Sequence, residues 1–473
     1  MPKTNTIHTT HTSLHALSSA LRQGQLTSAR LTEQMLERIA STDTSGVVFT
    51  TVFASQAREA AQQADQRWSA GAPRSPIDGI PLSIKDLFDV EGLKTTAGSV
   101  VLNQAQVPAA QADALVVQRL KQAGAVILGR TNMTEFAYSG LGINPHHGTP
   151  LSPWDRATQR LAGGSSSGAA VSVSDGMAAA AIGTDTGGSV RIPAAFCGLT
   201  GFKPTAKRID QTGAVPLSPS LDSIGPIGHR VSCCQWLDAV MAGDQASMWA
   251  AESGAESGAG AAQASASSRP VLGIPKQLVR DAMDETVASV FTKATEALQR
   301  AGFRIEEVDL PELHELAVMN ANGGLTAAES WQWHEQVLRQ GQAQYDPRVA
   351  VRILRGQQID AQAYQRLLQQ RADWIARISP KISAFDALWM PTVPVVPPPL
   401  APLLESDEAY AQINLLTLRN PSVINVLDGC ALSLPFQADS DAPPVGLMIA
   451  SVANRDAALL QLGQRCESVF MGM

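Results

Sequence analysis

Residues 163–195 have the sequence GGSSSGAAVSVSDGMAAAAIGTDTGGSVRIPAA and carry the most informative pattern in the chain. Two Gly/Ser clusters, residues 163–168 and 183–189, flank one helix-like and one strand-like segment. Small residues let backbones approach one another closely and adopt conformations that a Cβ atom would forbid. The two clusters are therefore predicted to form tight turns whose backbone groups can take part in a functional site.

Ser189 ends the second cluster and precedes the sequence VRIP, residues 190–193. A glycine turn that enters a helix exposes a hydroxyl group at its tip. The backbone amides of Thr186, Gly187, Gly188 and Ser189 can then converge on one point and form an oxyanion hole. Each such donor contributes about 2.7–4 kcal/mol to transition-state stabilisation. The alternative for a lone Gly-Gly-Ser is an anion-binding turn at a helix N-terminus.

A nucleophilic serine needs a base, and none of the eight histidines carries a motif of its own. Lys85 is the candidate because it ends the apolar run IPLSI, residues 80–84, where a surface charge is hard to explain. Burial or cationic neighbours can lower the pKa of a lysine to about 7–8. The alternative is a strand-end lysine whose amine reaches solvent.

The segments around these residues alternate between strand and helix patterns. Residues 80–90 and 125–130 read as buried strands, and residues 112–124 between them read as an amphipathic helix closed by glycine. Two short helices open the chain, the second with Ser28 as its N-cap. Further strands are predicted at 271–274, 303–308, 387–396 and 445–452, and further helices at 54–69, 233–243, 284–301 and 455–470, with 326–383 mostly helical.

These patterns predict an α/β fold, a single large domain with a mixed central β-sheet covered by helices on both faces. The expected parts of this 1–473 domain are an N-terminal helical segment (1–70), a catalytic core (71–245), a flexible low-complexity linker (251–269), a mostly helical substrate-side excursion (275–385) and a C-terminal return to the core (386–473).

Composition narrows the class of protein. The 473 residues are 44% hydrophobic and 17% charged, with a formal net charge of −7, so the chain can fill a large core and has no basic stripe. We therefore expect no nucleic-acid and no membrane partner. Five cysteines without regular spacing, and no signal peptide, predict a cytoplasmic protein. Zinc-ligand spacing, a P-loop, GxGxxG and HExxH are all absent, so no metal and no cofactor are expected.

The motifs together resemble the amidase signature family. The resemblance rests on GGSSSG and GTDTGGSVRIPAA at the family's spacing, on IPLSIKD (80–86) before them and on CGLTGFKPT (197–205) after them. It extends to residues 124–140, 216–226, 420–435 and 443–450. The resemblance implies a Ser–cis-Ser–Lys catalytic unit in which Ser189 is the nucleophile, Ser165 the cis-serine and Lys85 the base.

The resemblance also assigns supporting roles. Ser166 and Thr184 match positions that hydrogen-bond the relay, and Ala137 and Tyr138 lie where family members line the acyl pocket. We also expect Asp185 and Arg191 to brace the catalytic loop as an ion pair or as backbone clamps, and Cys197 to be a small buried residue. The implied activity is hydrolysis of a small-molecule carboxamide to the carboxylic acid and ammonia or an amine, through an acyl-enzyme on Ser189. A homodimer is compatible with the resemblance.

Three alternatives compete with this interpretation. The glutaminase-type component of a tRNA-dependent amidotransferase, its A subunit, has the same Ser–Ser–Lys unit, so the motif cannot decide between the two. Residues 164–168 also fit the G-x-S-x-G nucleophile elbow of α/β-hydrolases, but residues 155–162 are a poor preceding strand and no histidine follows His334. A binding or scaffold protein that keeps the fold is disfavoured because all three catalytic positions are intact.

Overall fold

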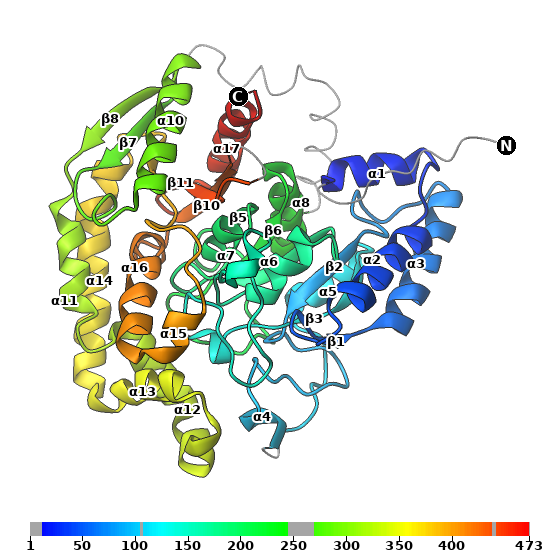
Figure 1. Cartoon of the computed structure of the whole chain (residues 1–473), viewed down its shortest axis with the longest axis horizontal. Helices are drawn as coiled ribbons and strands as arrows, with labels where there is room; N and C mark the ends of the chain where they lie inside the picture. The colour runs from blue at the N-terminus through cyan, green and yellow to red at the C-terminus, as the bar shows by residue number, and fades with distance from the viewer. Residues whose placement is uncertain (1–11, 105–106, 245–268, 438–440, 473) are drawn as a thin grey trace.

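The computed structural model describes residues 12–104, 107–244, 269–437 and 441–472 (Figure 1). The linker predicted at 251–269 lies outside the described residues except for residue 269. Eleven strands of the described residues form one mixed sheet. They are β1 (Phe49–Val52), β2 (Pro81–Lys85), β3 (Val126–Thr131), β4 (Ala180–Thr184), β5 (Thr200–Lys203), β6 (Ile224–Gly228), β7 (Val271–Pro275), β8 (Arg304–Val308), β9 (Ala387–Pro391), β10 (Cys430–Phe436) and β11 (Val445–Ser451).

The strand order is β1-β3-β2-β4-β6-β5-β10-β11-β9-β7-β8, which in Figure 1 runs from β1 on the right to β8 at the upper left. β2 pairs in parallel with both β3 and β4, and β7 pairs in parallel with β8 and β9. The other pairings are antiparallel, as between β10 and β11. All five residues of β2 are buried, as expected for a central parallel strand covered on both faces.

Helices cover both faces of this sheet. They are α1 (Leu14–Arg22), α2 (Ser28–Thr42), α3 (Ala54–Ser69), α4 (Val101–Gln104), α5 (Leu115–Gln122), α6 (Ser167–Ser174), α7 (Arg191–Phe196), α8 (Val231–Ala242), α10 (Glu285–Arg300), α11 (Glu315–Met319), α12 (Gly324–Gly341), α13 (Pro347–Leu354), α14 (Ala361–Ile382), α15 (Ala401–Glu405), α16 (Asp407–Val426) and α17 (Asp456–Met471). No helix in the described part of the chain combines the length and the hydrophobicity that a membrane span requires.

The two faces of the C-terminal half of the sheet can be followed along β11. Leu447 and Ile449 join a hydrophobic cluster that includes residues of α10 and α17, whereas Met448 and Ala450 join another that includes residues of α14 and α16. Successive side chains of a strand point to opposite faces, so a strand that is apolar at every position needs cover on both sides. The predicted α/β class with a helix-covered mixed sheet is therefore confirmed.

The structure differs from the sequence prediction at several elements. β1, β5, β6, β10 and α16 were not predicted. Ser28 does not cap α2: the Thr27 side chain accepts the hydrogen bond from the Arg30 amide, and the Ser28 hydroxyl donates to the Gly79 carbonyl. Both residues suit an N-cap, and tertiary contact with Gly79 decided which one takes that role.

The catalytic motifs meet because of this topology. The parallel neighbours β2 and β4 end at Lys85 and Thr184, so both residues lie at the same edge of the sheet. α6 begins at Ser167 and α7 at Arg191, and the two Gly/Ser clusters lead into these helices. The ends of β2 and β4 and the starts of α6 and α7 therefore lie close together, although they come from separate stretches of the chain.

Candidate active site

Lys85 is fully buried at the end of β2. Its Nζ donates to Ser165 Oγ at 2.7 Å and to Thr184 Oγ1 at 2.8 Å. Burial lowers the pKa of Lys85 to about 7, against the negative charges of Asp222 and Asp185, which raise it. The alternative of a lysine reaching solvent is wrong, and near neutral pH a large fraction of this amine is uncharged.

Ser165 follows a cis peptide bond from Gly164 and is fully buried. Its carbonyl accepts from the Thr134 amide at 3.1 Å, and its hydroxyl accepts from Lys85. The next residue, Ser166, joins the two Gly/Ser clusters: its amide donates to the Ser189 carbonyl at 3.2 Å and its hydroxyl donates to the Thr184 carbonyl at 3.4 Å. The structure therefore places Ser166 and Thr184 against the predicted relay.

Ser189 stands at the tip of the loop between β4 and α7 and is 3% exposed. The Asp185 carboxylate holds this loop, since it accepts from the amides of Gly188 at 2.8 Å and Val190 at 3.2 Å. Asp185 also forms a fully buried ion pair with Arg191, with Nη2 to Oδ1 at 2.8 Å and Nε to Oδ2 at 3.0 Å. Both expected forms of bracing, ion pair and backbone clamp, are present.

The buried pair is completed from a distant part of the chain. Asn425 on α16 donates to the Asp185 carboxylate and carbonyl, both at 2.9 Å, and accepts from Arg191 at 2.7 Å. Burial alone would raise the pKa of Asp185, but the charge and hydrogen bonds of Arg191 hold it well below its usual range. Asp185 is therefore a carboxylate throughout the physiological pH range.

The four backbone amides predicted to form the oxyanion hole differ in their hydrogen-bond partners. The Gly188 amide donates to Asp185, so the prediction that it is an oxyanion donor is corrected: this N–H is already engaged by a carboxylate. The amides of Thr186, Gly187 and Ser189 donate to no atom of the described residues. These three remain the candidate donors.

Asp222 is a second buried carboxylate beside the site, and the sequence reasoning assigned it no role. It accepts from the Thr186 hydroxyl at 2.5 Å and from the amides of Leu217 and Ser218, both at 3.0 Å. Burial raises the pKa of Asp222 to about 6, and its negative charge acts on Lys85. Asp222 thus fixes the loop at Thr186, and its negative charge favours the protonated form of the Lys85 amine. Its place in PLSPSLDSIGP, within the family resemblance, was the available signal.

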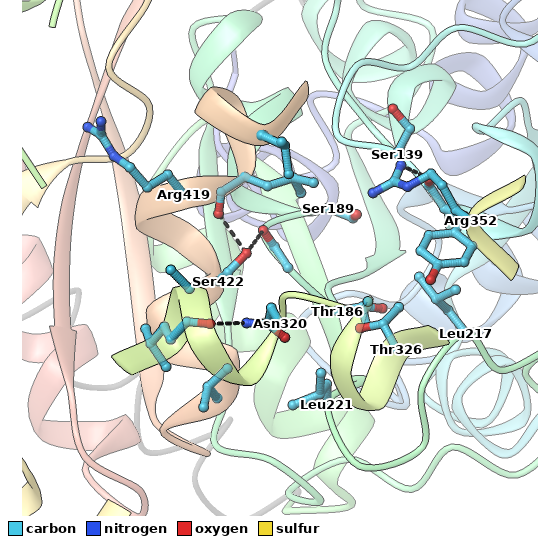
Figure 2. Close-up of a pocket in the computed structure, with 18 of the residues that line it drawn as sticks. Ser139, Thr186, Ser189, Leu217, Leu221, Asn320, Thr326, Arg352, Arg419 and Ser422 are labelled. Atoms are coloured by element: carbon cyan, nitrogen blue, oxygen red, sulfur yellow. Dashed lines mark hydrogen bonds between the residues drawn. The ribbon is translucent and has the colours of Figure 1, made fainter. Parts of the chain in front are cut away.

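A cavity of about 360 Å³ opens onto Ser189. Ala137 and Tyr138 line it together with Thr186 and Gly187, so the structure brings both predicted acyl-pocket residues to the nucleophile loop. Residues of α11, α12, α13 and α16 complete the lining, among them Thr326, Arg352 and Ser422 in Figure 2. Cys197 is buried away from this cavity, and burial raises the pKa of its thiol, so it is an inert core residue.

Comparisons with known proteins give independent information on the family and the fold of the chain. The family model described as Amidase matches residues 30–460. The chain is 33% identical over 462 residues to 2-amino-5-chloromuconic acid deaminase of Comamonas testosteroni, covering 97% of this chain and 96% of that protein. It is 32% identical over 487 residues to the A subunit of glutamyl-tRNA(Gln) amidotransferase of Chloroflexus aggregans, covering 97% of each. A crystal structure of an amidase superposes with a TM-score of 0.83 at 30% identity, covering 97% of this chain and 100% of that chain.

Proposed function

The chain belongs to the amidase family, and on this premise we propose that it hydrolyses a small-molecule carboxamide through an acyl-enzyme on Ser189. One observation carries the proposal: the fully buried Lys85, whose pKa burial lowers to about 7, is hydrogen-bonded at 2.7 Å to Ser165 beside the nucleophile loop. A group with a pKa near the working pH is the most effective general base.

The first half of the reaction forms an ester. Ser189 Oγ attacks the carbonyl carbon of the amide, its proton passes to Ser165 Oγ, and the Ser165 proton passes to the neutral Lys85 amine. The amides of Thr186, Gly187 and Ser189 donate hydrogen bonds that stabilise the negative charge developing on the carbonyl oxygen. The C–N bond then breaks as the proton returns through Ser165 to the leaving nitrogen.

The second half releases the acid. Water attacks the ester carbonyl carbon and gives its proton to the same relay, and the Ser189 oxygen leaves and regains a proton. Lys85 ends the cycle as a neutral amine. Thr184 supports the relay because its hydroxyl accepts from Lys85, and Ser166 supports it because its amide donates to the Ser189 carbonyl.

The leaving group in this proposal is ammonia. The name of one relative of nearly full coverage, an amidotransferase component, describes transfer of an amide nitrogen. We therefore infer a primary carboxamide, so the variable part of the substrate lies on the acyl side of the scissile bond.

A second candidate function is the glutaminase-type component of a tRNA-dependent amidotransferase complex, its A subunit, which the second relative supports. The two functions differ in what the purified chain does alone. A free-standing amidase releases ammonia from simple amides without a further protein. The amidotransferase component needs its partner chains and tRNA for full activity. Size-exclusion chromatography of the same preparation tests the predicted homodimer.

The test of the main proposal is ammonia release from a panel of aliphatic and aromatic primary amides. We expect Ser189→Ala to lower the rate by at least about 10³-fold. The matched control is Ser174→Ala on α6, whose hydroxyl donates to the Val171 carbonyl outside the cavity, and it should retain the wild-type rate. Loss of only a few-fold in Ser189→Ala would reject the assigned nucleophile.

A further inference from the structure

The cavity in front of Ser189 is apolar but carries positive charge. Leucine is the most frequent residue of its wall, and the leucines include Leu217, Leu221 and Leu418. Its charged residues are Arg352, Arg355 and Arg419, and no aspartate or glutamate is among the lining residues of the described chain. A cavity with this balance favours a ligand that is hydrocarbon over most of its surface and negatively charged at one end.

Arg419 belongs to the part of α16 that touches the nucleophile loop. One turn further along the helix, the Ser422 hydroxyl donates to the Leu418 carbonyl at 2.6 Å and lies 3.4 Å from the Gly187 carbonyl oxygen. Leu418, Arg419 and Ser422 all line the cavity. Figure 2 shows Arg419 and Arg352 on opposite sides of Ser189.

The guanidinium of Arg419 is half-buried, and no carboxylate in the described part of the chain forms an ion pair with it. Its Nε donates to Asn420 Oδ1 at 3.0 Å, and its Nη2 lies 3.3 Å from the Val279 carbonyl oxygen. The negative charge of Asp281 acts on it, but Asp281 is exposed and the two form no ion pair within the described residues. Burial lowers the pKa of Arg419. A partly desolvated cation without a counter-charge gains free energy when an anion binds to it.

Arg352 and Arg355 are in different situations. The Arg352 guanidinium donates to the Tyr138 carbonyl and lies 4.6 Å from the centre of the Tyr138 ring, so its donors and charge hold the cavity wall. Arg355 is exposed. Arg352 and Arg419 are both half-buried and both donate to neutral groups, but only the Arg352 guanidinium is stacked on an aromatic ring.

We propose that the substrate is a carboxamide that carries a carboxylate on its acyl part, and that Arg419 binds this carboxylate. The inference rests on the proposed function, in which Ser189 is acylated and ammonia leaves. The guanidinium can bind both carboxylate oxygens at once, while the leucines contact the hydrocarbon between carboxylate and amide. Arg419 is then the residue that distinguishes anionic amides from neutral ones.

The test compares matched pairs of amides that differ only in the terminal group. Succinamate, glutaramate and adipamate carry a carboxylate, and butanamide, pentanamide and hexanamide carry a methyl group in its place. We expect wild-type kcat/KM to be at least tenfold higher for the charged member of at least one pair. Arg419→Gln should reduce this charged-to-neutral ratio at least tenfold, mainly through KM, and Arg419→Lys should restore part of it.

Two further variants make the assignment specific. Arg352→Gln should change both members of a pair by similar factors, because Arg352 supports Tyr138 in either case. The exposed Arg300→Gln on α10 is the matched control for charge and should leave the ratio unchanged.

The outcomes separate the inference from the proposed function. If wild type hydrolyses every neutral amide as well as its charged partner, or if Arg352→Gln and not Arg419→Gln abolishes the preference, the inference is overturned while the amidase function stands. If no amide is hydrolysed faster than by Ser189→Ala, the proposed function itself is contradicted.

Discussion

Protonation of Lys85 is expected to inactivate the protein below about pH 7. Burial lowers the pKa of this amine to about 7, and only the neutral amine can accept the proton that Ser165 passes on. Below its pKa the neutral fraction falls about tenfold per pH unit. The value of kcat/KM should therefore be about half its plateau at pH 7 and about 1% of it at pH 5, with a plateau reached near pH 8.

Asp222→Asn tests the cause of this profile. Removing the Asp222 carboxylate removes a negative charge that raises the pKa of Lys85, so the acid limb should move to lower pH. The pKa of Asp222 is raised to about 6 by burial, so the carboxylate is mostly charged at pH 7, the midpoint of the wild-type limb. The matched control is Asp373→Asn on α14, an exposed carboxylate that accepts from Gln369, and it should leave the limb in place.

The measurement is initial ammonia release between pH 5 and pH 9 at constant ionic strength. A neutral amide is used, so that ionisation of the substrate does not enter the profile. The reasoning is refuted if kcat/KM is flat across this range or rises only above about pH 9, the region of an ordinary lysine. If the acid limb moves to higher pH in Asp222→Asn, the Asp222 charge does not raise the pKa of Lys85 and the reasoning is also refuted.

Three further substitutions test the loop and the relay. Thr184→Val removes one of the two hydrogen-bond acceptors of Lys85 and should lower kcat by about tenfold with little change in KM, measured by steady-state kinetics. Arg191→Met leaves the Asp185 charge buried and unpaired; the free energy of unfolding should fall by about 3–5 kcal/mol in urea titrations. Gly188→Ala forces a Cβ into a φ of 124° and to 2.6 Å from side-chain carbons of α7 and α16, so kcat should fall at least about 100-fold. Gly302→Ala, at φ 92° with no atom within 4 Å of the added Cβ, is its control for backbone strain and should keep the wild-type kcat.

The parts of the site that could be predicted lie in local patterns. Lys85 follows an apolar run that marks the end of a buried strand, and Ser189 follows glycines that precede a helix. In each case a few neighbouring residues determine the backbone, so the motif already contains the geometry. The contact of Lys85 with Ser165 joins residues from two such motifs, and the family resemblance was needed to pair them.

The elements that were missed are those whose form depends on distant parts of the chain. β6 has the sequence IGPIG, which is typical of a turn, yet it is a central strand because β4 and β5 bind it from both sides. α16 contains Pro421, which ordinarily breaks a helix, and this helix is buried around much of its C-terminal half. Tertiary contact overrides local propensity in both cases, and a single sequence does not show such contact.

The same distant contacts decide whether Lys85 can act as a base. Two buried carboxylates face this amine, and a fully uncompensated field from both would favour its charged form. Arg191 offsets the charge of Asp185 within a pair that Asn425 completes from the other end of the chain, whereas Asp222, whose pKa burial raises to about 6, is mostly charged at pH 7. The ion pair that sequence reasoning assigned to bracing therefore also keeps the amine close to neutrality at pH 7. A sequence motif can supply the lysine, but the packing of α16 against the nucleophile loop supplies the conditions under which it is a base.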